Sequence, residues 1–468
     1  MKTALRILLL PILLLCLATA AQATHIYSGY ISHTSDPQNP RRFDFTLTVY
    51  TLTASPAEDP FVYISMGDGT ILRVNREKIV RYNSRYDQEI FTWSFTYDLP
   101  GNYTVKWIAE NRNGGIINLP APSDQLTFHA ITHLQVNMST PNMNSPKLAG
   151  VPLAAVHTGE PWTHNLLAYD VDGDYLVYEL VPPKHRYPDG VSKNILGYQF
   201  PPGLTINEFG ELHWENPQAK GQHVIVVRVT EMRNGRVLGS MEVEMSFTVT
   251  DRTYQTTLEL LNKDHLTVND DGSIQTWPGQ KVKLEFYLRE SPGSDLPLSA
   301  KAFGEIDTLE LTDTSLAFRD TLDGFAVTYT FTPTPAMERT EPYLIGLRGR
   351  LLRDKPDYTN HFTVDDDWAF AYLYVGEQRR PLSPGEEPEV TQTKLYPNPA
   401  TDAFVVEAPN LANLYLQLRD VNGQEVTGYT LQPGRNTLSR PIGLASGLYF
   451  YTLMSGSDII SSGKLVFL

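Results

Sequence analysis

The chain has 468 residues, several times the usual domain length of about 100–150 residues, so we expect three or four domains. Its composition is that of a globular protein, with 41% hydrophobic, 11% aromatic and 19% charged residues. The formal net charge of −15 excludes nucleic-acid binders that depend on clustered Lys and Arg to displace counterions from phosphates.

The N-terminus has the three-part layout of a secretory signal peptide. Lys2 and Arg6 precede the apolar run Ile7–Leu17, and Ala21-Gln22-Ala23 follows as an A-x-A-type cleavage site. The run is too short to span a bilayer comfortably, although a retained membrane anchor is the alternative. We therefore expect residues 1–23 to be removed and the mature chain to lack a transmembrane segment.

Cys16 is the only cysteine and lies inside this apolar run. A lipoprotein would carry its lipid there, but Leu15 is bulky where a lipobox needs a small residue. Removal of the signal peptide leaves no cysteine, so neither disulfides nor thiolate metal sites can stabilise the mature chain. Each domain must then bury a core of its own.

Hydrophobic residues recur at every second position over much of the chain. In the most regular example, Met241–Thr250, apolar residues at odd positions alternate with polar residues at even positions. Successive side chains of a strand point to opposite faces, so this pattern predicts a strand with one buried face. Turn signals such as Asp68-Gly69 and Asn422-Gly423 separate many of these segments. We predict an all-β fold of tandem antiparallel β-sandwiches, the last one small and C-terminal.

Composition also indicates where the domains begin and end. Residues 377–393 are rich in proline and glutamate and cannot bury a core, so they form the predicted linker. Further boundaries are expected in the polar stretch 137–146 and after the strand that ends near Thr250. The predicted domains are 24–137, 138–251, 252–376 and 394–468.

The last segment carries three motifs in a characteristic order. These are Tyr396-Pro397-Asn398-Pro399 at its start, Gly447-Leu-Tyr449 in its second half and Lys464-Leu-Val-Phe-Leu at its end. The segment resembles the C-terminal sorting domain (type A) of the type IX secretion system found in Bacteroidota. This resemblance implies the secretion machinery as a partner, passage through the periplasm and across the outer membrane, and attachment to the cell surface or release. It also implies removal of the domain, for which the extended linker is a suitable cleavage region.

The first two segments resemble modules of surface proteins. Tyr63–Thr70, with its Gly-Asp-Gly turn, and Phe95–Lys106, with Pro-Gly-x-Tyr, resemble the PKD-type immunoglobulin-like fold. Gly159–Trp162, Tyr169–Tyr178 and Gly210–Trp214 resemble the cadherin-like or immunoglobulin-like repeats of bacterial surface proteins. These resemblances imply immunoglobulin-like sandwiches in an adhesion or motility-associated protein. The segment 252–376 is expected to be a further sandwich.

One acidic turn has the spacing of a cation site. Asp170, Asp172 and Asp174 alternate, and Gly173 allows a tight turn. Alternate carboxylates on such a turn can converge on Ca²⁺, which takes six to eight oxygen ligands. The alternative is a solvated acidic turn between strands. We expect Asp365–Asp367 to be an exposed charged turn.

No catalytic residue is predicted, because His-Glu-x-x-His, Gly-x-Ser-x-Gly and the phosphate-binding loop are all missing from the sequence. We therefore expect an exported surface protein that binds a glycan or protein ligand or acts as a scaffold. The alternative is a secreted enzyme or carbohydrate-binding protein with its site in 252–376, where Glu305, Asp307 and Asp320 offer carboxylates. A concave pocket there with convergent carboxylates or aromatic residues would favour the alternative.

Overall fold

The computed structural model describes residues 26–376 and 393–467, apart from short gaps at 56–58, 84, 139–142, 234–235, 310, 312, 356–357, 402, 410, 412, 421–423, 442 and 457. The predicted signal peptide, and the predicted linker except for its last residue, lie outside this part of the chain. The chain divides into two compact units, Met1–Gln378 and Arg379–Leu468. No helix within the described ranges is long and apolar enough to cross a membrane.

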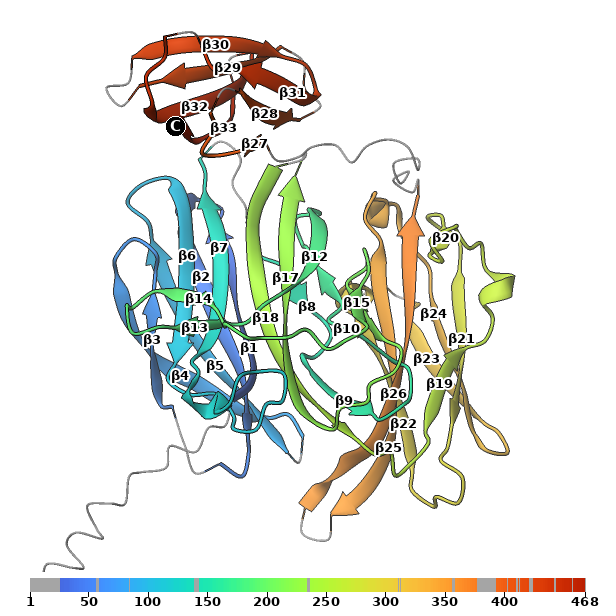
Figure 1. Cartoon of the computed structure of the whole chain (residues 1–468). Helices are drawn as coiled ribbons and strands as arrows, with labels where there is room; N and C mark the ends of the chain where they lie inside the picture. The colour runs from blue at the N-terminus through green and yellow to red at the C-terminus, as the bar shows by residue number, and fades with distance from the viewer. Residues whose placement is uncertain are drawn as a thin grey trace, which may run out of the picture. The chain divides into compact units, whose positions relative to one another are not determined.

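The predicted fold class is confirmed, since the described residues form strands that pair into sandwiches (Figure 1). Seven strands make up residues 26–136, called the first sandwich below. They are β1 (Ile26–Asp36), β2 (Asn39–Leu52), β3 (Phe61–Ser65), β4 (Ile71–Arg81), β5 (Tyr86–Thr96), β6 (Gly101–Ala109) and β7 (Phe128–Val136), with the 3-10 turn η1 (Ser123–Gln125) before β7. Residues 71–75 of β4 pair with β3, and residues 76–81 pair with β5, with a bulge between Arg76 and Lys78.

Residues 143–250, called the second segment, contain eleven strands. They are β8 (Lys147–Leu148), β9 (Leu153–His157), β10 (Trp162–Asn165), β11 (Ala168–Tyr169), β12 (Tyr175–Val181), β13 (Lys184–Arg186), β14 (Ser192–Asn194), β15 (Leu204–Ile206), β16 (Glu211–Trp214), β17 (Gly221–Arg233) and β18 (Arg236–Thr250).

Strand β18 belongs to both the first sandwich and the second segment. It pairs with β17 over most of its length, and its remaining pairing positions are taken in turn by β7, β1 and β9. The strand order β1-β2-β5-β4-β3-β6-β7-β18 therefore closes on itself through the β1–β18 pair. One hydrogen-bonded sheet runs across the boundary that we expected near residue 137.

The two faces of β18 differ from the prediction of a single buried face. Its apolar face contributes to the core of the second segment, as expected. Its opposite face is also buried, because Lys184 and Arg228 pair with Glu242, and Arg112 pairs with Glu244. Lys184 comes from the β13–β14 hairpin, which crosses in front of β7 and β18 in Figure 1. Tertiary contacts thus bury glutamates that the alternation alone would place in water.

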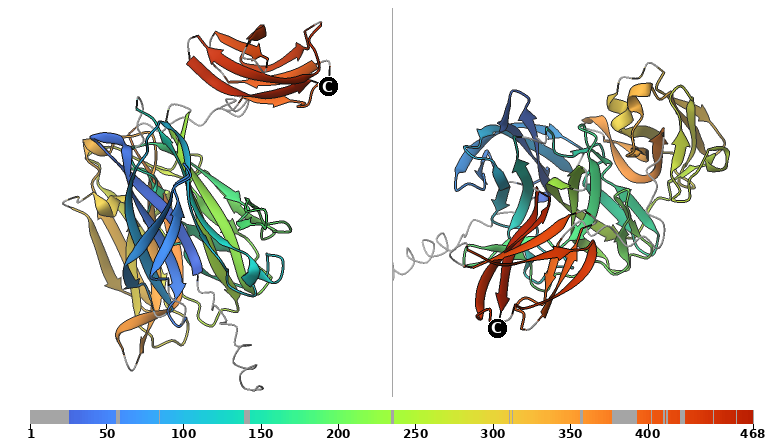
Figure 2. Two further views of the ribbon diagram at one scale, coloured as in Figure 1. Left: turned by 90° about the vertical axis from the view of Figure 1, so that its left-hand side faces the viewer. Right: turned by 90° about the horizontal axis from the view of Figure 1, so that it is seen from above.

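Residues 257–375, called the third sandwich, consist of two four-stranded sheets around an apolar core. Its strands are β19 (Thr257–Leu260), β20 (Ile274–Thr276), β21 (Val282–Arg289), β22 (Leu298–Gly304), β23 (Ser315–Asp320), β24 (Gly324–Phe331), β25 (Tyr343–Lys355) and β26 (Tyr358–Val375). Three 3-10 turns lie between them: η2 (Lys263–His265), η3 (Glu305–Thr308) and η4 (Pro335–Met337). The view from above in Figure 2 shows the strands of this sandwich in yellow and orange. Leu167 and Phe209 of the second segment pack against Leu344 and Tyr372 of the third sandwich, so these parts share a small apolar interface.

The second unit is a small sandwich of a three-stranded and a four-stranded sheet, called the C-terminal sandwich. Its strands are β27 (Lys394–Tyr396), β28 (Ala403–Ala408), β29 (Leu414–Arg419), β30 (Glu425–Leu431), β31 (Gly434–Ser439), β32 (Gly447–Ser455) and β33 (Asp458–Phe467).

Candidate functional site

The predicted cation-binding turn lies between β11 and β12. Gly173 has a φ of 78°, a conformation that side chains other than glycine rarely adopt. The Oδ1 atom of Asp170 accepts hydrogen bonds from the backbone N–H groups of Asp172 (2.9 Å) and Asp174 (3.0 Å). These two bonds stabilise the turn. They involve only the Oδ1 atom, so the Oδ2 atom of Asp170 takes no part in them.

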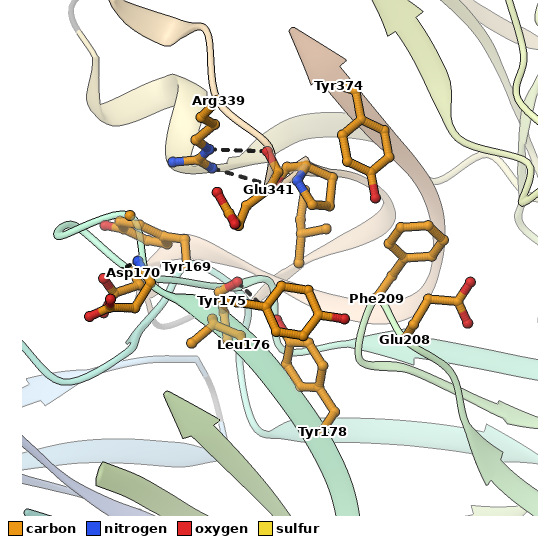
Figure 3. A pocket seen from close by; sticks show the side chains of 15 residues that line it. Tyr169, Asp170, Tyr175, Leu176, Tyr178, Glu208, Phe209, Arg339, Glu341 and Tyr374 are labelled. Atoms are coloured by element: carbon orange, nitrogen blue, oxygen red, sulfur yellow. Dashed lines mark hydrogen bonds between the residues drawn. The ribbon is translucent and has the colours of Figure 1, made fainter. Parts of the chain in front are cut away.

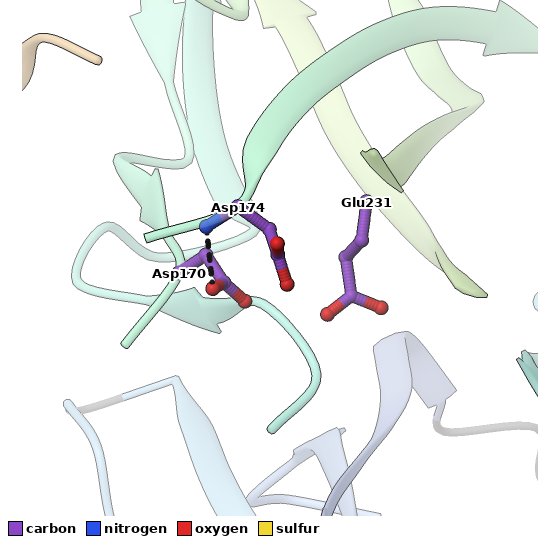
Figure 4. Close-up of side chains that lie close together, drawn as sticks. All are labelled: Asp170, Asp174 and Glu231. Atoms are coloured by element: carbon purple, nitrogen blue, oxygen red, sulfur yellow. Dashed lines mark hydrogen bonds between the residues drawn. The ribbon is translucent and has the colours of Figure 1, made fainter. Parts of the chain in front are cut away.

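The structure brings two of the three predicted ligands together with a third residue that the sequence analysis did not name. Glu231 on β17 lies opposite Leu176 on β12, and this register carries its carboxylate to Asp170 and Asp174. One oxygen from each of these three side chains lies within 4.8 Å of the others (Figure 4). Exposure is 4% for Asp170, 5% for Asp174 and 0% for Glu231. We call these three residues the acidic cluster.

The side chain of Asp172, in contrast, is used to hold the start of the second segment. Its Oδ2 atom accepts hydrogen bonds from the backbone N–H groups of Met143 (3.1 Å) and Asn144 (2.8 Å). Its Oδ1 atom accepts a third from the side-chain amide of Asn144 (2.9 Å). Glu231 therefore replaces Asp172 as the third carboxylate of the group.

Charge is only partly balanced in the acidic cluster. The guanidinium of Arg233 donates two hydrogen bonds to the carboxylate of Asp174, with Nε–Oδ1 and Nη2–Oδ2 distances of 2.6 and 2.7 Å. Burial raises the pKa of Asp170 to about 6, and the nearby carboxylates of Asp174 and Asp172 add to this effect. The Oδ2 atom of Asp170 has no hydrogen-bond donor among the described residues. Three carboxylates and one guanidinium suit a further positive group, either a shared proton or a hard divalent cation.

The acidic cluster borders a cleft of about 60 Å³ between the second segment and the third sandwich. Asp170 and Asp174 form part of its wall, and aromatic side chains line much of the rest (Figure 3). Those rings belong to Tyr169, Tyr175, Tyr178, Phe209 and Tyr374. The cleft is concave and holds both carboxylates and aromatic residues, but it draws them from two segments rather than from 252–376 alone.

The acidic run at 365–367 is not the exposed turn that we expected. It lies within β26, where pairing with β25 keeps the backbone extended. Asp365 is buried and accepts a hydrogen bond from the backbone N–H of Thr256 (2.9 Å). Asp366 pairs with Arg348 (2.7 Å), and Asp367 accepts a hydrogen bond from the backbone N–H of Leu258 (2.8 Å). Burial raises the pKa of Asp367 to about 6.

A second cleft, of about 80 Å³, lies beside this run. It is lined by residues of β9, β10 and β26 and by the segments next to them, including His157, Glu160, Trp162, Asp366 and Trp368. Both clefts are therefore placed where the second segment meets the third sandwich.

The predicted sorting motifs meet in the C-terminal sandwich. The side chain of Asn398 donates to the carbonyl oxygen of Lys464 (2.7 Å) and accepts from the backbone N–H of Val466 (2.9 Å). The first motif, which runs from Tyr396 through Pro397 to Pro399, is thus tied to the last strand. At the start of β32, which begins at Gly447, the hydroxyl of Tyr449 donates to Ala445 (2.8 Å).

The fold is that of a multidomain β-sandwich protein, and residues 394–467 match the family described as Secretion system C-terminal sorting domain. This match shows that the protein is sorted by type IX secretion to the cell surface or the extracellular space.

Solved structures with weak similarity include Sidekick-1 immunoglobulin domains 1–5 and the human Desmocollin-1 ectodomain. The first has 10% identity and a TM-score of 0.15 and covers 95% of this chain and 80% of its own. The second has 10% identity and a TM-score of 0.18, with coverages of 90% and 76%. TM-scores this low do not bear on the architecture, which rests on the strand pairing. No curated protein matches the chain.

Proposed function

We propose that this protein is a noncatalytic surface protein that binds or spaces a partner in adhesion or motility. The observation that carries the proposal is β18, which completes the first sandwich and also forms part of the second segment. A shared strand fixes the geometry of residues 26–250, and a spacer or presenting scaffold needs such fixed geometry. The sorting domain puts this body where surface partners are found, and the PKD-like and cadherin-like resemblances agree with that role.

Two carboxylates of the third sandwich that the enzymatic alternative could use are bound by arginines. Glu305 accepts two hydrogen bonds from the guanidinium of Arg339, with Nη1–Oε1 and Nη2–Oε2 distances of 2.9 and 2.5 Å. Asp366 forms an ion pair with Arg348. An arginine that binds a carboxylate occupies the oxygens that a substrate would otherwise contact, so both carboxylates already have a structural partner. These groups are placed to hold strands and turns together.

Assays for turnover test the proposal directly. We expect the secreted protein to leave polysaccharide, peptide and ester substrates unchanged. Substrate cleavage that is abolished by Asp366→Asn and retained by Asp320→Asn, a change on the exposed edge strand β23, would establish the enzymatic alternative.

We further propose that Ca²⁺ binds at the acidic cluster. Two observations support it: three nearly fully buried carboxylates with ligand atoms within 4.8 Å, and the buried Asp170 Oδ2 without a donor. Buried ionised carboxylates are costly unless they are paired or coordinate a cation. A Ca²⁺ ion there would link the β11–β12 turn to β17.

Thermal unfolding with Ca²⁺ or a chelator tests this second proposal. A free Ca²⁺ concentration a hundredfold above Kd should stabilise the protein by about 2.7 kcal/mol. Glu231→Gln should abolish the Ca²⁺-dependent shift, while Asp172→Asn, the matched control, should keep it. An unchanged midpoint at millimolar Ca²⁺, or loss of the shift in the control alone, would contradict the assignment.

A further inference from the structure

The first sandwich presents an outward sheet face over β3, β4 and β6, and the exposed residues of this face lie mainly on β3 and β4. In β3, β4 and β6 the inward residues Val62, Ile64 and Val105 are buried in the core. The register places the intervening residues on the opposite, outward face, since Tyr63 lies opposite Arg73 and Ser65 lies between Ile71 and Lys106. We call this outward surface the basic face. It comprises Phe61, Tyr63, Ser65, Ile71, Arg73, Asn75, Thr104, Lys106 and Ile108.

The charge of the basic face is opposite to that of the chain. Its nine residues include two cations and no carboxylate, while the whole chain has a net charge of −15. Within the described residues, neither Arg73 nor Lys106 lies within ion-pair distance of a carboxylate. The acidic side chains nearest to these two cations along the chain have partners of their own. Glu77 accepts from the hydroxyl of Thr92 (2.7 Å), Asp68 accepts from the Thr70 N–H (2.9 Å), and Glu110 pairs with Arg186 (3.0 Å).

Large apolar side chains accompany these cations on the basic face. Tyr63 is 59% exposed and Ile71 is 68% exposed. The rings of Phe61 and Tyr63 meet edge to face, with centroids 5.7 Å apart. The guanidinium of Arg73 lies 3.9 Å from the Phe61 ring centroid and donates to the side chain of Asn75 (3.0 Å). The planar cation is therefore held in place, next to an exposed aromatic ring. Figure 1 shows β3 and β4 at the side of the first sandwich.

From this arrangement we infer that the basic face binds an anionic polysaccharide. A local positive charge on an acidic chain selects an anionic partner. An open sheet face fits an extended polymer better than a small molecule, which needs a concave pocket. The ring of Tyr63 offers an apolar surface to the C–H face of a sugar, and Arg73 has the fork geometry that matches a carboxylate or sulfate. The inference rests on the proposed surface-binding role and names its ligand class.

Three immobilised polymers separate the contributions to binding. Polygalacturonate carries a carboxylate on each sugar, dextran is a neutral sugar polymer, and polyglutamate is anionic without sugar rings. We expect the secreted protein to be retained strongly by polygalacturonate, more weakly by polyglutamate and not by dextran.

Matched variants then locate the surface. Arg73→Glu and Lys106→Glu should each weaken polygalacturonate binding about tenfold, because each reverses a charge that faces the polymer. Tyr63→Ala should weaken it about three- to tenfold and leave polyglutamate binding unchanged. Lys193→Glu, an equal charge change at an exposed position on β14, is the control and should have no effect. If Lys106→Glu unfolds the protein, Lys106→Gln tests the same charge.

The results that would overturn the inference are distinct. Equal retention by polyglutamate would assign the face to an acidic protein instead, and binding to dextran would remove the role of charge. An equal loss in Lys193→Glu would show that net charge, and not the basic face, governs binding. Shortening of polygalacturonate by the protein would instead contradict the noncatalytic function, so the two failures are distinguishable.

Discussion

The buried ion pair between Arg112 and Glu244 gives a sharp test of how the first sandwich and the second segment are joined. Arg112 lies between β6 and β7, and Glu244 lies on β18. Their side chains are 2% and 3% exposed. Arg112 also donates to the carbonyl oxygen of Lys184 (3.0 Å), and burial lowers its pKa to about 9. We predict that the pair is strongly coupled although it adds little net stability.

The magnitude follows from the burial of both groups. Glu244→Leu leaves a buried guanidinium without its counter-charge, and removal of one partner of such a pair costs about 3–5 kcal/mol. Replacing both partners with apolar residues removes the desolvation cost as well, and such replacements are often neutral or stabilising. The double variant Arg112→Met with Glu244→Leu should therefore recover most of the stability lost by the single variant.

Denaturant unfolding of the wild type, both single variants and the double variant measures this coupling as a double-mutant cycle. Lys220 and Asp251, an exposed pair, serve as the control, and their removal should change stability little. If the free energies of the two single changes at Arg112 and Glu244 simply add, the pair is not coupled and our account of β18 fails.

Two further predictions concern pH and the C-terminal sandwich. His33 is buried between Phe43 and Phe45, and burial lowers its pKa to about 4. The unfolded chain, with a histidine pKa near 6.5, binds a proton that the folded chain does not, so stability should fall by about 3 kcal/mol from this residue as pH drops from about 6.5 to 4. The variant His33→Leu should lack this pH-dependent loss, which is measured as the difference in the free energy of unfolding between wild type and variant at each pH. If the free energy of unfolding changes equally with pH in both proteins, the prediction is wrong. Asn398→Ala should destabilise the C-terminal sandwich by about 1–2 kcal/mol and lower the exported fraction; unchanged melting and export would refute this.

Period-two alternation predicts strands reliably here because a strand's buried face is a local property. In β21, for example, Val282, Leu284, Phe286 and Leu288 alternate with polar residues and are all buried. Strand partners are not local. β18 pairs with β1, more than 200 residues earlier, and no composition shift near residue 137 reveals that the sheet continues. Linker composition can therefore indicate a domain limit such as 377–393, whereas a limit that depends on long-range strand pairing, such as the one expected near residue 137, cannot be predicted from local sequence.

The acidic cluster shows the same division between local and distant information. Asp170 and Asp174 share one turn, so spacing alone brings them together. Glu231 lies 57 residues after Asp174 and reaches them only through the β12–β17 register. A signal for it was present, since Glu231 follows Val227 and Val229 on the core-facing side of β17. A carboxylate at a position where alternation requires an apolar residue marks a buried charge that needs a partner.

The basic face leads to a last prediction, on ionic strength. At about 0.01 M salt the Debye length is about 30 Å, so the net charge of −15 repels an anionic polymer over much of the molecule. At about 0.15 M it is about 8 Å, and the polymer responds mainly to Arg73 and Lys106 beneath it. Near 1 M it is about 3 Å, and that local attraction is screened as well. Retention on polygalacturonate should therefore pass through a maximum at intermediate salt. A monotonic decrease from the lowest salt would show that repulsion by the acidic chain is not felt at the face, whereas retention that does not change with salt would remove the electrostatic basis of the assignment.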